Sequence, residues 1–237
     1  MAASSNAFVT TVEPLGAHRF TIVWLHDMDE NDNDSARFVR SLQLRNIKWI
    51  CLYSGVGSLT WPNGVGMNIT TWHNINMSTD KMQDHLNGLD YAAMRVADIL
   101  SNEPAGSVIP GVGGVGFGAL VALHFATNCA LRRFPVVLRL AIGINGWLYT
   151  YDSIKSKIES EYGAARSTAY QSILLTHGAS NPRVPNFFVN KSVDSLREAG
   201  FTDVSLVEFP RLGHEITEDV ENAVKAWLQE KLALDPA

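Results

Sequence analysis

The chain has 237 residues, of which 46% are hydrophobic and 18% are charged, a composition typical of a globular protein and not of a disordered or fibrous one. Its formal net charge is −5 and its basic residues are scattered, so the sequence lacks the basic stripe that binding to nucleic acid requires. Residues 1–20 contain no basic start followed by an apolar run. We therefore expect a cytoplasmic protein without a signal peptide or stable membrane insertion.

Short apolar runs alternate with helical patterns along the chain, at intervals too long for hairpins. The predicted strands cover residues 20–25, 49–53, 108–112, 136–144, 173–176 and 204–209, and the predicted helices cover 35–44, 82–100, 117–131, 187–199 and 215–234. This order predicts an α/β fold with a mostly parallel central sheet and helices on both faces. We expect one domain over residues 19–237, after a flexible segment at 1–18, and an irregular surface segment at 54–80.

The two cysteines, Cys51 and Cys129, each lie in apolar sequence and have no metal-type spacing. This pattern predicts two reduced thiols in the core and excludes a disulfide framework.

The segment that joins the predicted strand at 108–112 to the helix at 117–131 is rich in glycine. Residues 114–118 read Gly-Val-Gly-Phe-Gly, which fits the G-x-S-x-G frame of a nucleophile elbow with Gly116 in the central position. In such an elbow the central residue has a strained backbone conformation, which glycine tolerates well. Because Gly116 has no side-chain oxygen, no covalent acyl intermediate can form there.

Residues 111–120 resemble the G-V-G-G-F-S-x-G-A segment of plant members of the acyl-protein thioesterase and carboxylesterase family, with Gly116 in place of the serine. The resemblance extends from about residue 19 to about residue 232. It includes Trp72 and the sequence Gly-Ile-Asn-Gly-Trp-Leu at 143–148. The resemblance implies an α/β-hydrolase fold.

Two further segments resemble the rest of the catalytic triad of that family. Residues 177–185 resemble its H-G-x-x-D-x-x-V-P, which puts Asn181 at the position of the acid, and residues 212–214 end in the retained histidine, His214. The chain order of nucleophile, acid and histidine agrees with this assignment. A neutral amide orients an imidazole but does not stabilise an imidazolium, and the comparable Asp-to-Asn change in serine proteases costs about 10⁴ in rate.

The loop at 26–32 departs from the family, because Asp27 and Asp29 stand where its H-G-L-G-D stretch has glycines. The resemblance implies that a backbone N–H of this loop contributes to the oxyanion hole. Carboxylates nearby oppose the negative charge that develops on a substrate oxygen. The acidic run continues to Asp34 but lacks the turn glycine and final glutamate of a calcium loop. We expect a solvated loop and assign no metal.

Two alternatives stay open. Gly111, Gly113 and Gly116 satisfy the G-x-G-x-x-G dinucleotide fingerprint, and although no acidic residue lies between residues 118 and 151 to bind a ribose, Arg132 and Arg133 are compatible with NADP. The second alternative is residual, serine-independent carboxylesterase or acyl-protein thioesterase activity, in which His214 activates water.

The sequence therefore predicts a pseudoenzyme of this family that binds a small acyl, lipid-like or carboxylate ligand, or a protein partner such as an active homologue. Its site consists of Gly116, Asn181 and His214 and needs no cofactor. Met28, Trp72, Phe117 and Trp147 are the expected ligand-binding residues. The N–H groups that begin the helix at 117–131 are expected to attract a carboxylate, and the missing serine side chain is expected to enlarge the cleft floor.

Overall fold

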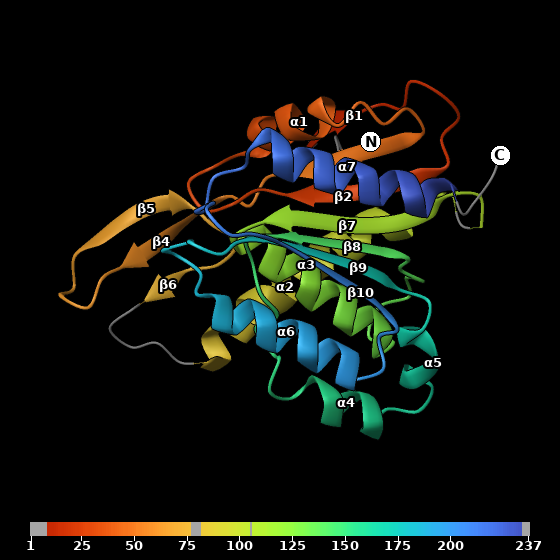
Figure 1. The fold of residues 1–237 in the computed structure, drawn as a ribbon. Coiled ribbons are helices and arrows are strands. Elements are labelled where there is room, and N and C mark those ends of the chain that lie inside the picture. The colour runs from red at the N-terminus through yellow and green to blue at the C-terminus, as the bar shows by residue number, and fades with distance from the viewer. Residues whose placement is uncertain (1–8, 77–81, 105, 234–237) are drawn as a thin grey trace, which may run out of the picture.

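The computed structural model describes residues 9–76, 82–104 and 106–233, and its centre is a seven-stranded sheet (Figure 1). The strands follow the order β1-β3-β2-β7-β8-β9-β10, and every neighbouring pair is parallel except β1 with β3. Their bounds are β1 (Val9–Val12), β2 (Phe20–Leu25), β3 (Ile47–Leu52), β7 (Ile109–Val115), β8 (Leu140–Ile144), β9 (Ser172–Gly178) and β10 (Asp203–Phe209). The predicted mostly parallel α/β sheet is confirmed.

Helices cover both faces of this sheet, and its inner strands are mostly buried and present apolar side chains alternately to each face (Figure 1). In β2, Val23 and Leu25 belong to one core cluster, whereas Ile22 and Trp24 belong to the other. The first face carries α2 (Met82–Ser101), α3 (Phe117–Ala130), α4 (Ile154–Ser160), α5 (Ala164–Thr168) and α6 (Asn186–Glu198). The second carries α1 (Asp32–Ser41) and α7 (Glu218–Ala233).

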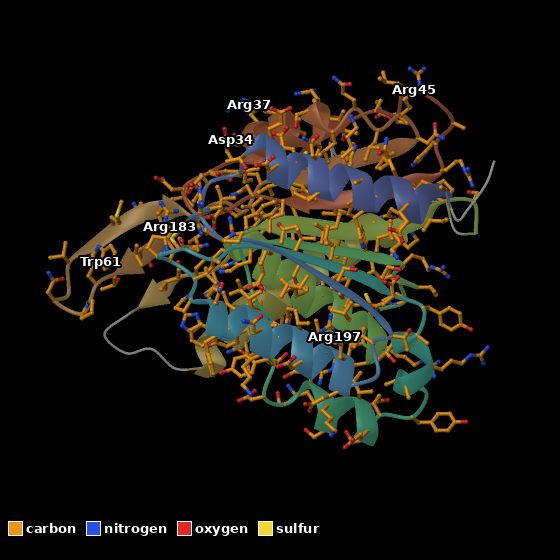
Figure 2. The ribbon with its side chains drawn as sticks, viewed as in Figure 1. Asp34, Arg37, Arg45, Trp61, Arg183 and Arg197 are labelled. Carbon is orange, nitrogen blue, oxygen red and sulfur yellow. The ribbon has the colours of Figure 1, made fainter. Side chains whose placement is uncertain are left out.

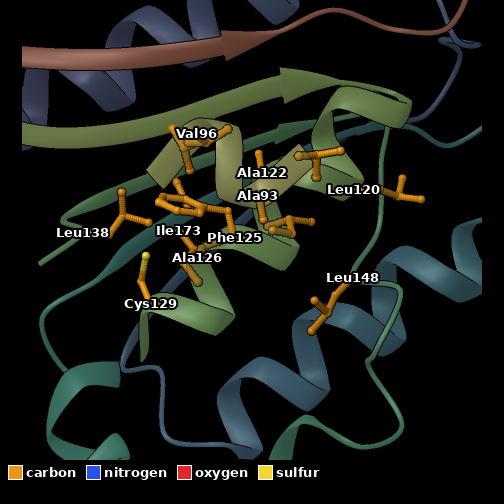
Figure 3. Packing of buried hydrophobic residues seen from close by; sticks show 14 of the residues in the cluster. Ala93, Val96, Leu120, Ala122, Phe125, Ala126, Cys129, Leu138, Leu148 and Ile173 are labelled. Atoms are coloured by element: carbon orange, nitrogen blue, oxygen red, sulfur yellow. The ribbon is translucent and has the colours of Figure 1, made fainter. Parts of the chain in front are cut away.

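Helix α3 is the most deeply buried helix, since every residue from Gly118 to Ala130 is buried. Figure 3 shows Phe125 and Ala126 of α3 among side chains from α2 and the sheet, including Val96 and Ile173. A helix that is apolar all round suits a position between the sheet and other helices. This packing fixes the start of α3 relative to the strand that precedes it.

The cysteines lie in the core as expected. Cys51 and Cys129 are free and buried, and burial raises the pKa of the Cys51 thiol to about 12. Burial also raises the pKa of Cys129. Both thiols are therefore protonated and unreactive near neutral pH.

Two expectations about the amino-terminal third were wrong. Val9–Val12, within the segment expected to be flexible, forms β1 and pairs antiparallel with β3, so that the sheet gains an edge strand. The segment expected to be irregular contains a small sheet of β4 (Val56–Thr60), β5 (Gly66–Thr70) and β6 (Ile75–Asn76), which extends beyond the main sheet in Figure 1. Its strands are rich in Gly, Asn and Thr, so they lack the apolar pattern of a core strand. Residues 77–80 lie outside the described residues.

The strand expected at 136–144 begins only at Leu140. The residue beside its upstream part is Pro110 of β7, whose carbonyl accepts the N–H of Arg139. Because proline has no N–H, Pro110 donates no further hydrogen bond to the residues before Arg139. The pairing of β8 with β7 therefore begins at Leu140, opposite Gly111.

Candidate functional site

The carboxyl end of β7 turns sharply into α3 at Gly116, which has φ 51° and ψ −114°. Its N–H donates to the carbonyl of Ile144 in β8 (N···O 2.8 Å), which anchors the turn to the sheet. A Cβ at Gly118 would overlap the carbonyl oxygen of Leu25 at the end of β2, so only glycine allows α3 to approach β2 this closely. The glycine elbow expected from the sequence is therefore present, with no side chain at its centre.

The Asp27 carboxylate fills this elbow. Its Oδ1 accepts the N–H groups of Met28 and Phe117, both at 2.8 Å, and its Oδ2 lies 2.7 Å from Nε2 of His214. A Cβ built on Gly116 would overlap Cγ and both oxygens of Asp27. The carboxylate thus occupies the volume into which a side chain at position 116 would project, and the expected enlargement of the cleft floor was wrong.

The hydrogen bonds of His214 fix which ring nitrogen carries its hydrogen. A carboxylate only accepts, so the bond to Asp27 requires a hydrogen on Nε2 of His214. On the other side of the ring, Nδ2 of Asn181 lies 2.9 Å from Nδ1 of His214. Oδ1 of Asn181, which is 3.3 Å from Nδ1, already accepts the N–H groups of Arg183 and Val184. The network fits a neutral ring that donates at Nε2 and accepts at Nδ1.

This arrangement reverses the one that general-base catalysis uses. A catalytic triad histidine donates at Nδ1 to the acid and keeps Nε2 free to take a proton from the nucleophile. In this chain the carboxylate lies on the Nε2 side, as Asp27, and the amide lies on the Nδ1 side, as Asn181. Asn181 contacts His214, and Asp27 lies between His214 and Gly116.

The loop that carries Asp27 is held by hydrogen bonds on several sides. His26 donates from Nδ1 to the Asp27 carbonyl (2.6 Å) and accepts the N–H of Ser54 at Nε2 (3.0 Å), and burial lowers the pKa of His26. The N–H of Asp29, whose φ is 65°, donates to Thr70 of β5. These bonds to the segment after β3 and to β5 hold the loop with the Asp27 carboxylate directed at the elbow.

Two further side chains hold the site from its edges. Glu30 accepts the N–H of Asp27 at Oε2 (3.1 Å), and burial raises the pKa of Glu30. Asn145, at φ 53° after β8, donates to the carbonyl of His214 (2.9 Å) and accepts the N–H of Gly178 (3.0 Å). Sequence reasoning missed Asn145, although an asparagine between a strand and a glycine is a signal for a left-handed turn.

The four expected ligand-binding residues have different environments. Met28 and Phe117 meet at Asp27 through their backbone N–H groups. Trp72 is 4% exposed and donates from Nε1 to the His26 carbonyl (2.9 Å), so it offers little surface to a ligand. The ring of Trp147 lies 5.7 Å from that of Phe188 in α6. Among the described residues, no group of three or more His, Cys, Asp or Glu side chains is placed to hold a metal ion.

The glycines of the dinucleotide fingerprint do not form a phosphate-binding turn. Gly111 and Gly113 lie inside β7 and pair with β2 and β8, so only Gly116 belongs to the turn. Arg132 follows the far end of α3, and Arg133 donates to Asn128 within it (3.1 Å). The elbow therefore has neither the phosphate-binding turn nor the nearby arginines that NADP binding requires.

An elbow after a central strand, followed by a polar residue after β9 and a histidine after β10 that contact each other, defines an α/β-hydrolase. The sequence model of the phospholipase/carboxylesterase family matches residues 6–232. The chain therefore belongs to the phospholipase/carboxylesterase family.

Solved structures agree with this assignment. Acyl-protein thioesterase 2 of Zea mays is 33% identical, with a TM-score of 0.85 over 94% of this chain and 98% of that chain. Arabidopsis thaliana SOBER1 is 19% identical (TM-score 0.68; 90% of this chain, 99% of that chain), and a Bacillus cereus carboxylesterase is 12% identical (TM-score 0.67; 95% and 96%); both share the fold. No curated protein matches the chain by sequence. In the part of the chain that the structure describes, no helix is long and apolar enough to cross a membrane.

Proposed function

We propose that the chain is a catalytically degenerate α/β-hydrolase that has lost acyl transfer and acts by binding. The observation that carries this proposal is the Asp27 carboxylate at the elbow. It takes the N–H groups of Met28 and Phe117, which the family fold offers to a substrate oxygen, and it covers Gly116, where the nucleophile belongs. A substrate carbonyl then finds neither a nucleophile nor free oxyanion donors.

His214 does not compensate for these losses. With its hydrogen on Nε2 and an acceptor facing it, the ring takes no proton from a water molecule on that side. Asn181 also supplies no negative charge to stabilise an imidazolium. The serine-independent hydrolase alternative requires this pair of hydrogen bonds to break and reform in the opposite direction.

A small acyl or lipid-like ligand, or a protein partner such as an active homologue, remains the proposed binding target. Exposed apolar side chains on the β4–β5 hairpin support a binding role. Val56, Trp61, Val65 and Met67 of the β4–β5 hairpin are all at least 42% exposed. Figure 2 shows Trp61 on this hairpin, which is tied to the Asp27 loop through Thr70. Four exposed apolar side chains on one hairpin suit a binding surface.

Hydrolysis of short- and medium-chain aryl esters and thioesters tests the loss of catalysis. We expect the purified protein, its His214→Ala variant and a mock purification to give indistinguishable rates, while an active serine hydrolase of the family turns the same substrates over. Turnover above the mock that disappears in His214→Ala would reject the proposal and establish a water-activated hydrolase.

A further inference from the structure

We propose that Asp27 is the resident ligand of an anion-binding site, and that this site binds small monocarboxylates once the Asp27 side chain is removed. The donors are the N–H groups of Met28 and Phe117 and Nε2–H of His214. This inference goes beyond the proposed function, because it names the chemical class that the elbow accepts and the residue that excludes it.

The geometry of the three donors is that of a carboxylate receptor. Two backbone N–H groups converge on one oxygen at 2.8 Å each, and an imidazole N–H meets the other oxygen at 2.7 Å. These lengths are typical of hydrogen bonds to an ionised group. The Asp27 side chain is 8% exposed, so the bonds form away from bulk water, where they are stronger.

The fold adds a second source of attraction for an anion. Phe117 is the first residue of α3, a helix of 14 residues, and its N–H is one of those that begin the helix without an intrahelical partner. The helix dipole places partial positive charge at this end. First-turn residues of α3 include no acidic side chain that would neutralise it.

Contacts other than those of the Asp27 side chain hold the three donors, and the loop with Met28 is held by the Asp29 N–H on Thr70 and by Glu30. Leu25 and Gly118 pack so closely that no Cβ fits between β2 and α3. Asn145 fixes the His214 carbonyl, and Asn181 fixes the ring from the Nδ1 side. A variant that lacks the carboxylate therefore retains three converging donors with no acceptor, which is the condition for binding an external one.

The size of the missing group determines which carboxylate fits. Asp27→Gly removes a CH₂–COO⁻ group, which acetate replaces atom for atom. Asp27→Ala removes only the COO⁻ group, so formate fits, whereas the methyl group of acetate meets the Cβ that this variant keeps. Acetate should thus stabilise the glycine variant, and formate the alanine variant.

The test measures the thermal unfolding midpoint of both variants in sodium acetate, sodium formate and sodium chloride at matched ionic strength and pH. We expect each variant to unfold at a lower temperature than the natural chain in chloride, and its matching carboxylate to recover several degrees, as mass action predicts for a ligand of the folded state. The natural chain should show no difference between the salts. The control is Asp29→Asn, which removes an exposed carboxylate of the same loop and should behave like the natural chain.

Amide NMR of the same variants locates the binding. The Met28 and Phe117 resonances should shift on titration with the matching carboxylate and saturate, and the natural chain should show no saturable shift at these residues. Equal responses to all three salts, or equal responses of the natural chain and the variants, would overturn the inference. If Asp27→Gly does not fold in chloride, folding that depends on acetate supports the inference, and failure to fold in acetate together with no formate response in Asp27→Ala contradicts it.

These outcomes are independent of those that test the proposed function. Absence of carboxylate binding would leave the loss of catalysis in place, because that assay concerns turnover by the natural chain. Turnover by the natural chain would reject the proposed function without affecting stabilisation of the variants.

Discussion

The elbow and the loop after β2 meet at Asp27, yet they depart from the nucleophile-elbow pattern in opposite ways. The elbow keeps its backbone geometry, with Gly116 at φ 51° and its flanking glycines packed against β2, and lacks only a side chain. The loop after β2 has gained side chains, and Asp27 projects one of them into the space that the elbow leaves. The fold thus keeps the backbone shape of the elbow while the side chain of a neighbouring loop fills it. A serine at position 116 would restore the nucleophile but would leave the Asp27 carboxylate in place.

The largest expected effect concerns turnover. Gly116→Ser with Asn181→Asp should remain nearly inactive, because Asp27 still occupies both oxyanion donors. Adding Asp27→Gly frees these donors, and removing a single such donor in a related mechanism costs about 10²–10³ in kcat. We expect the triple variant to exceed the double variant by at least about 10² in kcat on an aryl ester.

A control for this series is the triple variant with His214→Ala, which should return to the background rate. If the double variant turned over substrate as fast as the triple variant, Asp27 would not block the site. The claim that this loop side chain prevents catalysis would then be wrong.

The next effect concerns stability and tests whether Gly116 and Asp27 share one volume. Gly116→Ala places a Cβ on the Asp27 carboxylate and should lower the free energy of unfolding by about 3 kcal/mol, the upper range for overpacking a core. In an Asp27→Gly background the same change should cost at least about 1.5 kcal/mol less, because the overlapping group is absent. Urea unfolding of the four chains measures this coupling.

If the costs of Gly116→Ala and Asp27→Gly in unfolding free energy were strictly additive, the clash between the new Cβ and the Asp27 carboxylate would be relieved by a shift elsewhere. Gly64→Ala, at a position where a Cβ meets nothing within 4 Å and φ is 82°, is the matched control for the backbone strain alone. Its cost should not depend on Asp27.

The glycine frame after a predicted strand located the elbow at Gly116, and the resemblance to the family's motifs located Asn181 and His214. Neither predicted that Asp27 would enter the elbow. The direction of that side chain depends on the N–H of Ser54, which donates to His26, and on the carbonyl of Thr70, which accepts from Asp29; both residues lie far along the chain from Asp27 and have no local signature. The β4–β5 hairpin escaped prediction for a similar reason, since its strands pair mainly with each other and bury little.

A smaller effect concerns the direction of the hydrogen bonds through His214. Asp27→Asn places an amide N–H toward Nε2 while Asn181 already donates to Nδ1, so both ring nitrogens face donors. Adding Asn181→Asp restores a consistent chain in the opposite direction, with hydrogen on Nδ1. We expect the double variant to be more stable than the sum of the single changes predicts, by about 1–2 kcal/mol.

The ¹⁵N chemical shifts of the His214 ring distinguish this outcome from simple repacking. They should report hydrogen on Nε2 in the natural chain and on Nδ1 in the double variant. The same tautomer in both chains would show that Asp27 does not determine the ring's hydrogen.

The smallest effect concerns pH and involves histidines that burial keeps neutral. Burial lowers the pKa of His177 below its ordinary value of 6.5, so below that pH the unfolded chain binds a proton that the folded chain excludes. The contribution of His177 is therefore complete above pH 6.5 and is lost as the pH falls toward its folded pKa, with a slope of at most about 1.4 kcal/mol per pH unit. His177→Leu should reduce the decline in unfolding free energy between about pH 7 and about pH 5.5, measured in urea. Burial raises the pKa of Glu30, so Glu30 changes the unfolding free energy with pH in the opposite direction. This contribution is the same in the natural chain and in His177→Leu, so the difference between the two chains isolates His177. An unchanged pH slope in His177→Leu would show that this histidine is not held neutral by the fold.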